Sequence, residues 1–274
     1  RLPAYEIGFF RAFINVIAFL PLIIARPDKK WRGEIPALLL RGVSGTVAMW
    51  LSFYALQHIP IANAAMLNNT APLLVLVFSS VFLGETVSFL SFLFVLTAFI
   101  GVSLVVKPPV EILTLSQAFS SKGFWGTAAG ISSAVFSAVA YFSIKVATKN
   151  IQNHAIIFSF ALIASVMGFI PTAFMFVKPT PQEALYLFLA GMSATIAQHF
   201  LTKAYSGLPA SVASPMLFTV VVFSGILGWI VWGEIPDIWS FLGGTLIAIG
   251  LTGSQLARGG HLKFRRKKDM HVPQ

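Results

Sequence analysis

Polar side chains recur at helical spacing within the otherwise apolar segment 183–206. Thr195, Gln198, His199, Thr202 and Lys203 lie three or four residues apart along one stripe of a helix. Polar groups in so apolar a segment usually face the interior of a helical bundle or a wet cavity. Hydroxyl, amide and cationic groups without a carboxylate suit the binding of a neutral, zwitterionic or anionic molecule.

Other segments carry polar or aromatic groups that would line the same pocket. They are Trp50 and Tyr54, Asn68 and Asn69, Ser137 and Tyr141, and Arg11. Each has a structural alternative that the sequence leaves open. Lys203 is close to a segment end, where a lysine can extend to the membrane surface. The serines can mediate helix packing, and Arg11 can pair with Glu6.

The composition indicates a membrane protein, because 57% of the 274 residues are hydrophobic and only 10% are charged. Soluble domains carry about 25% charged residues. The net charge of +10 lies in short connections and in the C-terminal tail, a placement that sets topology or contacts anionic lipid rather than nucleic acid. The chain contains no cysteine, which excludes thiolate metal sites and disulfides. We expect no cofactor and no metal.

Nine segments approach the roughly 20 apolar residues that a membrane-spanning helix needs. Their ranges are 6–25, 36–57, 61–83, 87–106, 123–147, 154–177, 183–206, 210–232 and 236–257. Short turns rich in Gly and Pro separate most of them. The sequence therefore predicts an all-α polytopic membrane protein.

The chain repeats itself without a gap at an offset of 149 residues. Structure-breaking residues coincide between the copies: Pro60 with Pro209, and Gly84-Glu85 with Gly233-Glu234. Each glycine is predicted to end one helix, and each glutamate to open the next, where the helix dipole favours a carboxylate. We expect these six residues to be structural.

The repeat also predicts topology. Segment 123–147 finds its counterpart only before residue 1, so we expect a parent of two five-helix repeats whose first helix is missing here. Five helices per repeat give the copies opposite orientation, as in alternating-access carriers. The expected division is repeat 1 at 1–107, a loop at 108–122, repeat 2 at 123–257 and a basic tail at 258–274. Most of the 19 Lys and Arg residues lie on the tail side, which the positive-inside rule places in the cytoplasm at the plasma membrane.

Several of these motifs resemble the EamA family of the drug/metabolite transporter superfamily. They are Arg41-Gly42-Val43-Ser44-Gly45, Phe53-Tyr54-Ala55-Leu56, Leu83-Gly84-Glu85 and Trp232-Gly233-Glu234. The resemblance implies a ten-helix secondary transporter, importer or exporter, and not an enzyme. Its substrate would be a small organic metabolite such as an amino acid, a nucleotide-like compound or a carboxylate. His199 adds the hypothesis of proton coupling.

Two alternatives remain open at this stage. Gly42-Val43-Ser44-Gly45 matches the GxSG motif of rhomboid-type intramembrane proteases, with Ser44 as nucleophile and a histidine as base. A membrane partner that does not transport is the other alternative. The GxxxG pattern from Gly126 to Gly130 permits close helix packing, within one chain or in a homodimer.

Overall fold

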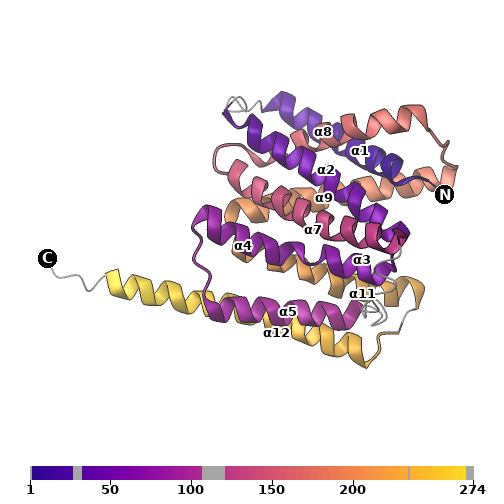
Figure 1. Cartoon of the computed structure of the whole chain (residues 1–274). Coiled ribbons are helices and arrows are strands. Elements are labelled where there is room, and N and C mark those ends of the chain that lie inside the picture. The colour runs from indigo at the N-terminus through magenta and orange to yellow at the C-terminus, as the bar shows by residue number, and fades with distance from the viewer. Residues whose placement is uncertain (1, 27–32, 107–120, 234, 270–274) are drawn as a thin grey trace.

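The computed structural model describes residues 2–26, 33–106, 121–233 and 235–269, and this part of the chain is a bundle of helices (Figure 1). The helices are α1 (Ala4–Ala25), α2 (Ile35–His58), α3 (Ile61–Asn68), α4 (Ala71–Leu83), α5 (Phe89–Val106), α7 (Ser121–Ala147), α8 (Asn153–Phe174), α9 (Pro181–Gly207), α10 (Ala210–Ala213), the 3₁₀ helix η3 (Pro215–Phe218), α11 (Thr219–Trp232) and α12 (Ile238–Asp269). Within this part, nine spans are long and apolar enough to cross a membrane. The expectation of an all-α polytopic membrane protein is confirmed. Glu234 and residues 107–120 of the inter-repeat loop lie outside the described residues.

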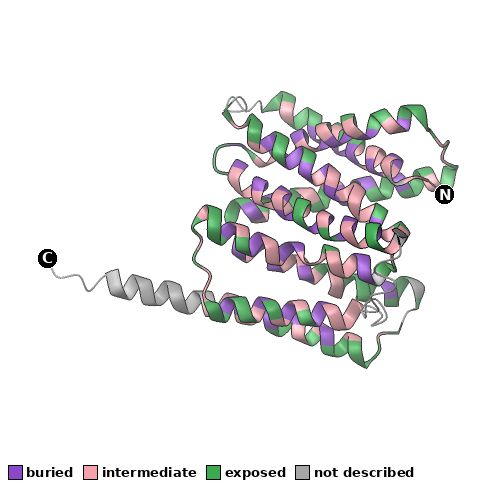
Figure 2. Ribbon diagram, in the orientation of Figure 1, coloured by how far each residue is buried: buried purple, intermediate pink, exposed green. Residues whose placement is uncertain are grey.

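The outer surface of the bundle is apolar. Large side chains such as Phe174, Phe223 and Ile230 are exposed, and Figure 2 shows exposed positions along the outward faces of the helices. In water such a surface would be unstable, whereas a lipid environment solvates it and requires only that backbone groups be bonded within helices. The helices therefore expose to lipid the large apolar side chains that a soluble bundle would bury.

Two spans are broken in the middle, and the breaks are related by the repeat. The first runs through α3 and α4, and the second through α10, η3 and α11. At the equivalent positions Thr70 and Thr219, the side-chain hydroxyl donates to the carbonyl three residues earlier. The breaks lie against each other, since Ser214 Oγ donates to the carbonyl of Pro72 at 3.3 Å. Interrupted helices at the interface of two repeats are typical of transporters.

Equivalent glycines show that the two copies are related by an approximate twofold axis. A Cβ on Gly42 would lie 2.3 Å from Ile163 Cδ1, and one on Gly191 would lie 2.4 Å from Ile14 Cδ1. Ile163 and Ile14 are themselves 149 residues apart, as are the glycines. Gly42 of the first copy thus contacts Ile163 of the second, and Gly191 of the second copy contacts Ile14 of the first. Both copies use the same two positions for the contact, so the interface is self-complementary, as in a C2 dimer. The inverted repeat seen in the sequence is thus a feature of the fold.

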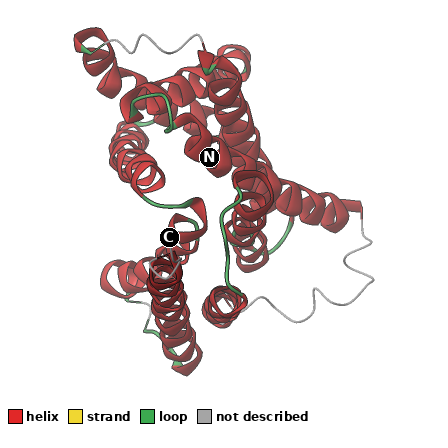
Figure 3. Ribbon diagram, turned by 90° about the vertical axis from the view of Figure 1, so that its left-hand side faces the viewer, coloured by secondary structure: helices red, strands yellow, loops and turns green. Residues whose placement is uncertain are grey.

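Helices α5 and α12 pack in the same twofold manner, backbone against backbone. A Cβ on Gly101 would lie 2.5 Å from the carbonyl oxygen of Gly243, and one on Gly250 would lie 2.5 Å from that of Phe94. Helix α12 continues past the predicted end of its span at residue 257, to Asp269. Its far end marks what we call the tail end of the bundle, the end from which Figure 3 views the molecule.

The repeat punctuation adopts matching conformations in both halves. Gly84 and Gly233 have φ of 64° and 71° and end α4 and α11 in the left-handed region, as predicted. Pro60 and Pro209 are the N-caps of α3 and α10, with φ of −52° and −56°.

The two glycines of the GxxxG pattern pack against helices of the same chain. Gly126 packs against His58 and Ile59, and Gly130 packs against Leu67. These contacts join α7 to the end of α2 and to α3. The homodimer stays a prediction that needs another surface.

Candidate functional site

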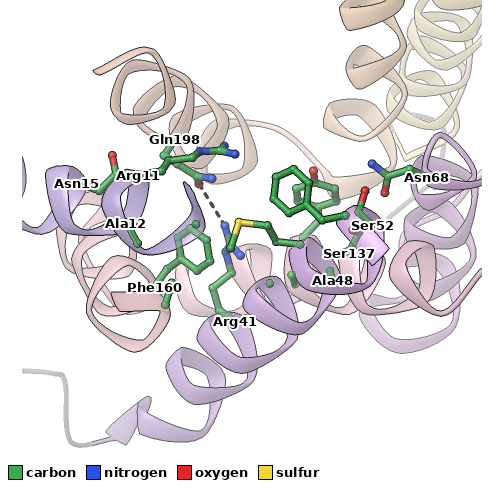
Figure 4. Close-up of a pocket in the computed structure, with 17 residues that line it drawn as sticks. Arg11, Ala12, Asn15, Arg41, Ala48, Ser52, Asn68, Ser137, Phe160 and Gln198 are labelled. Atoms are coloured by element: carbon green, nitrogen blue, oxygen red, sulfur yellow. Dashed lines mark hydrogen bonds between the residues drawn. The ribbon is translucent and has the colours of Figure 1, made fainter. Parts of the chain in front are cut away.

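A polar cavity of about 280 Å³, which we call the central cavity, lies among α1, α2, α3, α7, α8 and α9 (Figure 4). Both repeats contribute to it. Its polar lining consists of Arg11, Asn15, Arg41, Ser52, Asn68, Ser137, Tyr141 and Gln198, with Met49, Phe53, Phe160 and small residues between them. Ligand sites in transporters of inverted repeats occur at such an interface near the middle of the membrane.

Arg41 is the most strongly positioned of these side chains. It is only 4% exposed, and its guanidinium carbon lies 3.9 Å from the centre of the Phe160 ring, a cation–π geometry. The Nη2 group of Arg41 donates to Gln198 Oε1 at 3.1 Å. A Cβ on Gly45 would lie 2.3 Å from Arg41 Nη1, so this glycine leaves the space that the guanidinium occupies.

The structure brings five of the sequence-predicted site residues to the cavity: Arg11, Asn68, Ser137, Tyr141 and Gln198. Figure 4 shows Arg11 and Gln198 on one side of the cavity and Asn68 and Ser137 on the other. Tyr141 is further fixed by stacking on Tyr205, with ring centres 5.9 Å apart. Asn68 Oδ1 accepts from Ser133 Oγ at 3.5 Å, which ties the broken span to α7.

Thr195 lies one step behind the cavity wall. Its hydroxyl donates to Asn15, a cavity residue that is only 2% exposed, and also to the carbonyl of Gly191 at 2.9 Å. Thr202 is buried elsewhere on α9. Thr195 therefore positions a lining residue, and Thr202 does not line the cavity.

The remaining predicted site residues lie outside the cavity. His199 and Lys203 are exposed on α9. Because a helix turns by about 100° per residue, His199 is rotated by about 100° from the lining residue Gln198, and Lys203 by about 140°. Tyr54 is exposed and stacks on His58, and Asn69 donates to the carbonyl of Ala65. Trp50 is half-buried, and its Nε1 has no hydrogen-bond partner among the described residues.

The sequence does not predict Arg41 as a lining residue, because a basic residue near the end of a segment is usually explained by the positive-inside rule. Asn15 and Phe160 were also missed. A signal was present in the repeat: the equivalent of Arg41 is Ala190, so the charge is not part of the shared helix pattern. The adjoining Gly45 was the other signal, since it marks a close approach that only the structure explains.

Two sets of polar contacts lie at the tail end of the bundle, one between the repeats and one within the second repeat. The Glu85 carboxylate accepts from the backbone N–H groups of Ala210 and Ser211 at 2.8 and 2.9 Å, and from Ser211 Oγ. We call this arrangement the Glu85 clamp. It corrects the expectation in one respect, because Glu85 binds the N-terminus of α10 in the other repeat. Nearby, Lys145 Nζ donates to the carbonyls of Tyr205 and Leu208 at 3.1 and 2.7 Å, at the C-terminus of α9.

Ser44 does not have the environment of a nucleophile. It is 3% exposed, and its hydroxyl donates to the carbonyl of Leu40 in its own helix. Neither His58, which bonds the carbonyl of Tyr54, nor His199 contacts it in the described structure. Hydroxyl bonding to the preceding turn is common for serine in membrane helices.

The fold and the cavity define a polytopic membrane transporter of small molecules. The model of the EamA-like transporter family matches residues 1–107 and 124–254. The chain belongs to this family.

Relatives and a solved structure agree with this assignment. The chain is 33% identical over 250 residues to the pseudopaline exporter CntI of Pseudomonas aeruginosa, covering 90% of this chain and 84% of the relative. It is 26% identical over 253 residues to an S-adenosylmethionine uptake transporter of Rickettsia bellii, covering 92% and 83%. A crystal structure with 17% identity matches 93% of this chain and 88% of its own, with a TM-score of 0.81, which supports the fold alone.

Proposed function

We propose that this protein is a secondary carrier that binds a small organic metabolite in the central cavity and moves it by alternating access between the two inverted repeats. The candidate substrates are amino acids, nucleotide-like compounds and carboxylates. The observation that carries the proposal is a polar cavity lined by both repeats, with Asn68 of the first broken span in its wall. That span meets the second broken span at Pro72 and Ser214.

Unequal closure of the two ends supports alternating access. At the tail end, the Glu85 clamp covers the start of α10, where Ala210 is fully buried. At the opposite end, Ile61, the equivalent of Ala210 at the start of α3, is 73% exposed. A carrier with inverted repeats changes its open side when the two repeats exchange conformations. In this proposal the conformer is the one closed at the tail end.

The same proposal includes the division into repeats at 1–107 and 123–257, a multi-pass location in the cell membrane and a cytoplasmic tail. It is supported by the twofold contacts of Gly42 and Gly191 and by the distribution of Lys and Arg. Relatives named for export and for uptake support a carrier whose direction depends on the gradient that drives it.

Flux through proteoliposomes tests this function. Purified protein is reconstituted, and uptake and efflux of radiolabelled amino acids, nucleotides and carboxylates are measured against empty liposomes. Gln198→Ala removes the lining amide that bonds Arg41 and is expected to lower flux at least about tenfold, the factor for about 1.4 kcal/mol. His199→Ala is the matched control, because the adjacent side chain is exposed outside the cavity. Equal flux in both variants, or no flux of any compound, contradicts the proposal.

A further inference from the structure

Two arginines face the central cavity with no carboxylate to neutralise them. Arg41 and Arg11 both line it, from α2 and α1. A charged side chain within a membrane helix is costly, up to about 2.5–3.5 kcal/mol at the helix centre on insertion scales, and is normally paired. No ion pair joins either arginine to the described residues, and Arg11 has no hydrogen-bond partner among them.

Every carboxylate of the described side chains is engaged elsewhere. Glu6 accepts from the N–H of Val177 through Oε2, while its Oε1 is buried without a hydrogen-bond partner among the described residues. Glu34 accepts from Asn150, Glu85 from α10, Glu183 from Thr180 and Asp237 from Ser240. None of these five lines the cavity. The protein thus supplies two cations to this space and leaves the anion to come from outside.

The repeat shows that the fold does not need these polar groups. The 149-residue equivalents of Arg11, Arg41 and Gln198 are Phe160, Ala190 and Met49. The same helices therefore pack in the other copy with apolar residues at all three positions. Among the described residues, the contacts that offset the cost of the two guanidinium groups are the hydrogen bond of Arg41 to Gln198 and its cation–π contact with Phe160, and neither supplies a negative charge.

The arrangement around Arg41 prepares a planar guanidinium for a ligand. Phe160 stacks on one face and Gln198 accepts from one Nη2, so most of the five N–H donors stay available toward the cavity that Arg41 lines. Such a fork matches the two oxygens of a carboxylate in a bidentate pair, whereas a lysine would be only a point charge. Asn15, Ser52 and Ser137 supply hydroxyl and amide groups for the rest of a small ligand.

We propose that Arg41 and Arg11 form a carboxylate site and that the substrate is a small organic anion bearing at least one carboxylate. This inference rests on the proposed function only in taking the central cavity as the substrate site. Arg41 is the bidentate anchor, and Arg11, which is half-buried and unbonded, adds the second positive charge. The same charges disfavour organic cations, because a like charge in a low-dielectric cavity is repelled.

Calorimetric titration of the purified full chain in detergent tests the site without requiring transport. The probes are succinate, L-glutamate and nicotinate, each compared with the analogue in which every carboxylate is an amide, together with choline and inorganic phosphate. We expect at least one carboxylate to bind, its amide analogue to bind about tenfold more weakly or worse, and choline not to bind. Added salt should weaken the binding of the carboxylate.

Variants separate charge from folding. Arg11→Gln removes a positive charge whose side chain has no hydrogen bond among the described residues, and Arg41→Gln removes the anchor. Each should raise the Kd for the carboxylate about tenfold or more. The Kd of Arg41→Lys should lie between those of the unchanged protein and Arg41→Gln. Lys203→Gln, an exposed charge on α9, is the matched control and should leave Kd unchanged. Elution volume and helix content verify the fold of each variant.

The inference is overturned if no carboxylate binds more tightly than its amide, if phosphate binds more tightly than every carboxylate, or if Arg11→Gln and Arg41→Gln leave Kd unchanged. Flux of an uncharged metabolite without carboxylate binding would overturn the site and leave the carrier function standing. Carboxylate binding without flux of any compound would overturn the carrier function and leave the carboxylate site standing.

Discussion

Glu85→Gln should open the tail end of the carrier. The carboxylate holds the start of α10 through two backbone N–H groups and Ser211 Oγ, and so connects the end of the first broken span to the start of the second. The amide keeps one oxygen as an acceptor, but the other becomes an NH₂ group that faces a donor. The negative charge that the N-terminus of α10 favours is also lost.

The size of the effect follows from these bonds. Hydrogen bonds to charged groups contribute about 1.5–3 kcal/mol each in net terms. Loss of one such bond, with the others weakened to neutral strength, shifts the closed-to-open equilibrium by about 1.5–3 kcal/mol, which is roughly tenfold to a hundredfold. This shift acts on the conformer closed at the tail end and leaves the packing within each repeat intact.

Thiol accessibility measures the opening. The natural chain has no cysteine, so Ala140→Cys, at a buried cavity position on α7, introduces a single thiol. Its reaction with a membrane-impermeant maleimide is followed in inside-out and right-side-out vesicles. In the Glu85→Gln background the rate from the tail side should rise about tenfold or more, in line with the weakened clamp.

Glu183→Gln is the matched control for this experiment. Glu183 bonds Thr180, the N-cap residue of its own helix, in a capping box. Its loss should cost stability without changing accessibility. If Glu85→Gln changes the tail-side rate by less than about twofold, or about 0.4 kcal/mol, the clamp is a static cap and the reasoning on closure is refuted.

Two further predictions concern the packing that supports the cavity. Gly101→Val should destabilise the α5–α12 pair by about 1–3 kcal/mol, because the added Cβ would lie 2.5 Å from the carbonyl oxygen of Gly243; thermal unfolding in detergent measures this, and Gly225→Val, with no atom within 4 Å of its Cβ, should have a much smaller effect. Lys145→Met should lower stability by about 1.5–3 kcal/mol through the loss of two bonds to the carbonyls at the end of α9; the exposed Lys149→Met should not, and equal melting temperatures for the two lysine variants would contradict the role of Lys145.

Much of the architecture was predictable because its causes are local or periodic. A bilayer demands continuous apolar helices, so hydropathy gave the nine spans of the described part. Gly84 and Gly233 were recognised as helix ends, since a left-handed residue after a helix is most easily a glycine. The 149-residue offset is present in the printed sequence, and an odd number of helices per repeat implies inversion without any coordinates.

The residues predicted for the site show where local reasoning ends, because the cavity collects only some of them. Gln198 and His199 are neighbours in sequence and equally polar, but only Gln198 faces the cavity. Helical spacing shows that the polar residues of α9 lie on one side of the helix. It does not show which of them face the cavity, because that depends on where the neighbouring helices pack. Polar residues near the boundary are therefore assigned only after packing is known.

The sequence by itself determined the class of protein, the repeat and the residues that end its helices, since lipid solvation and backbone geometry act on each segment separately. The tertiary structure alone decided that Arg41, Phe160 and Gln198 meet, from three helices as far as 157 residues apart. It also decided that Glu85 binds the first turn of α10 and not the first turn of α5, the helix that follows Glu85 in the sequence. Contacts across the twofold interface depend on how whole helices pack, and no pattern within a single segment encodes them.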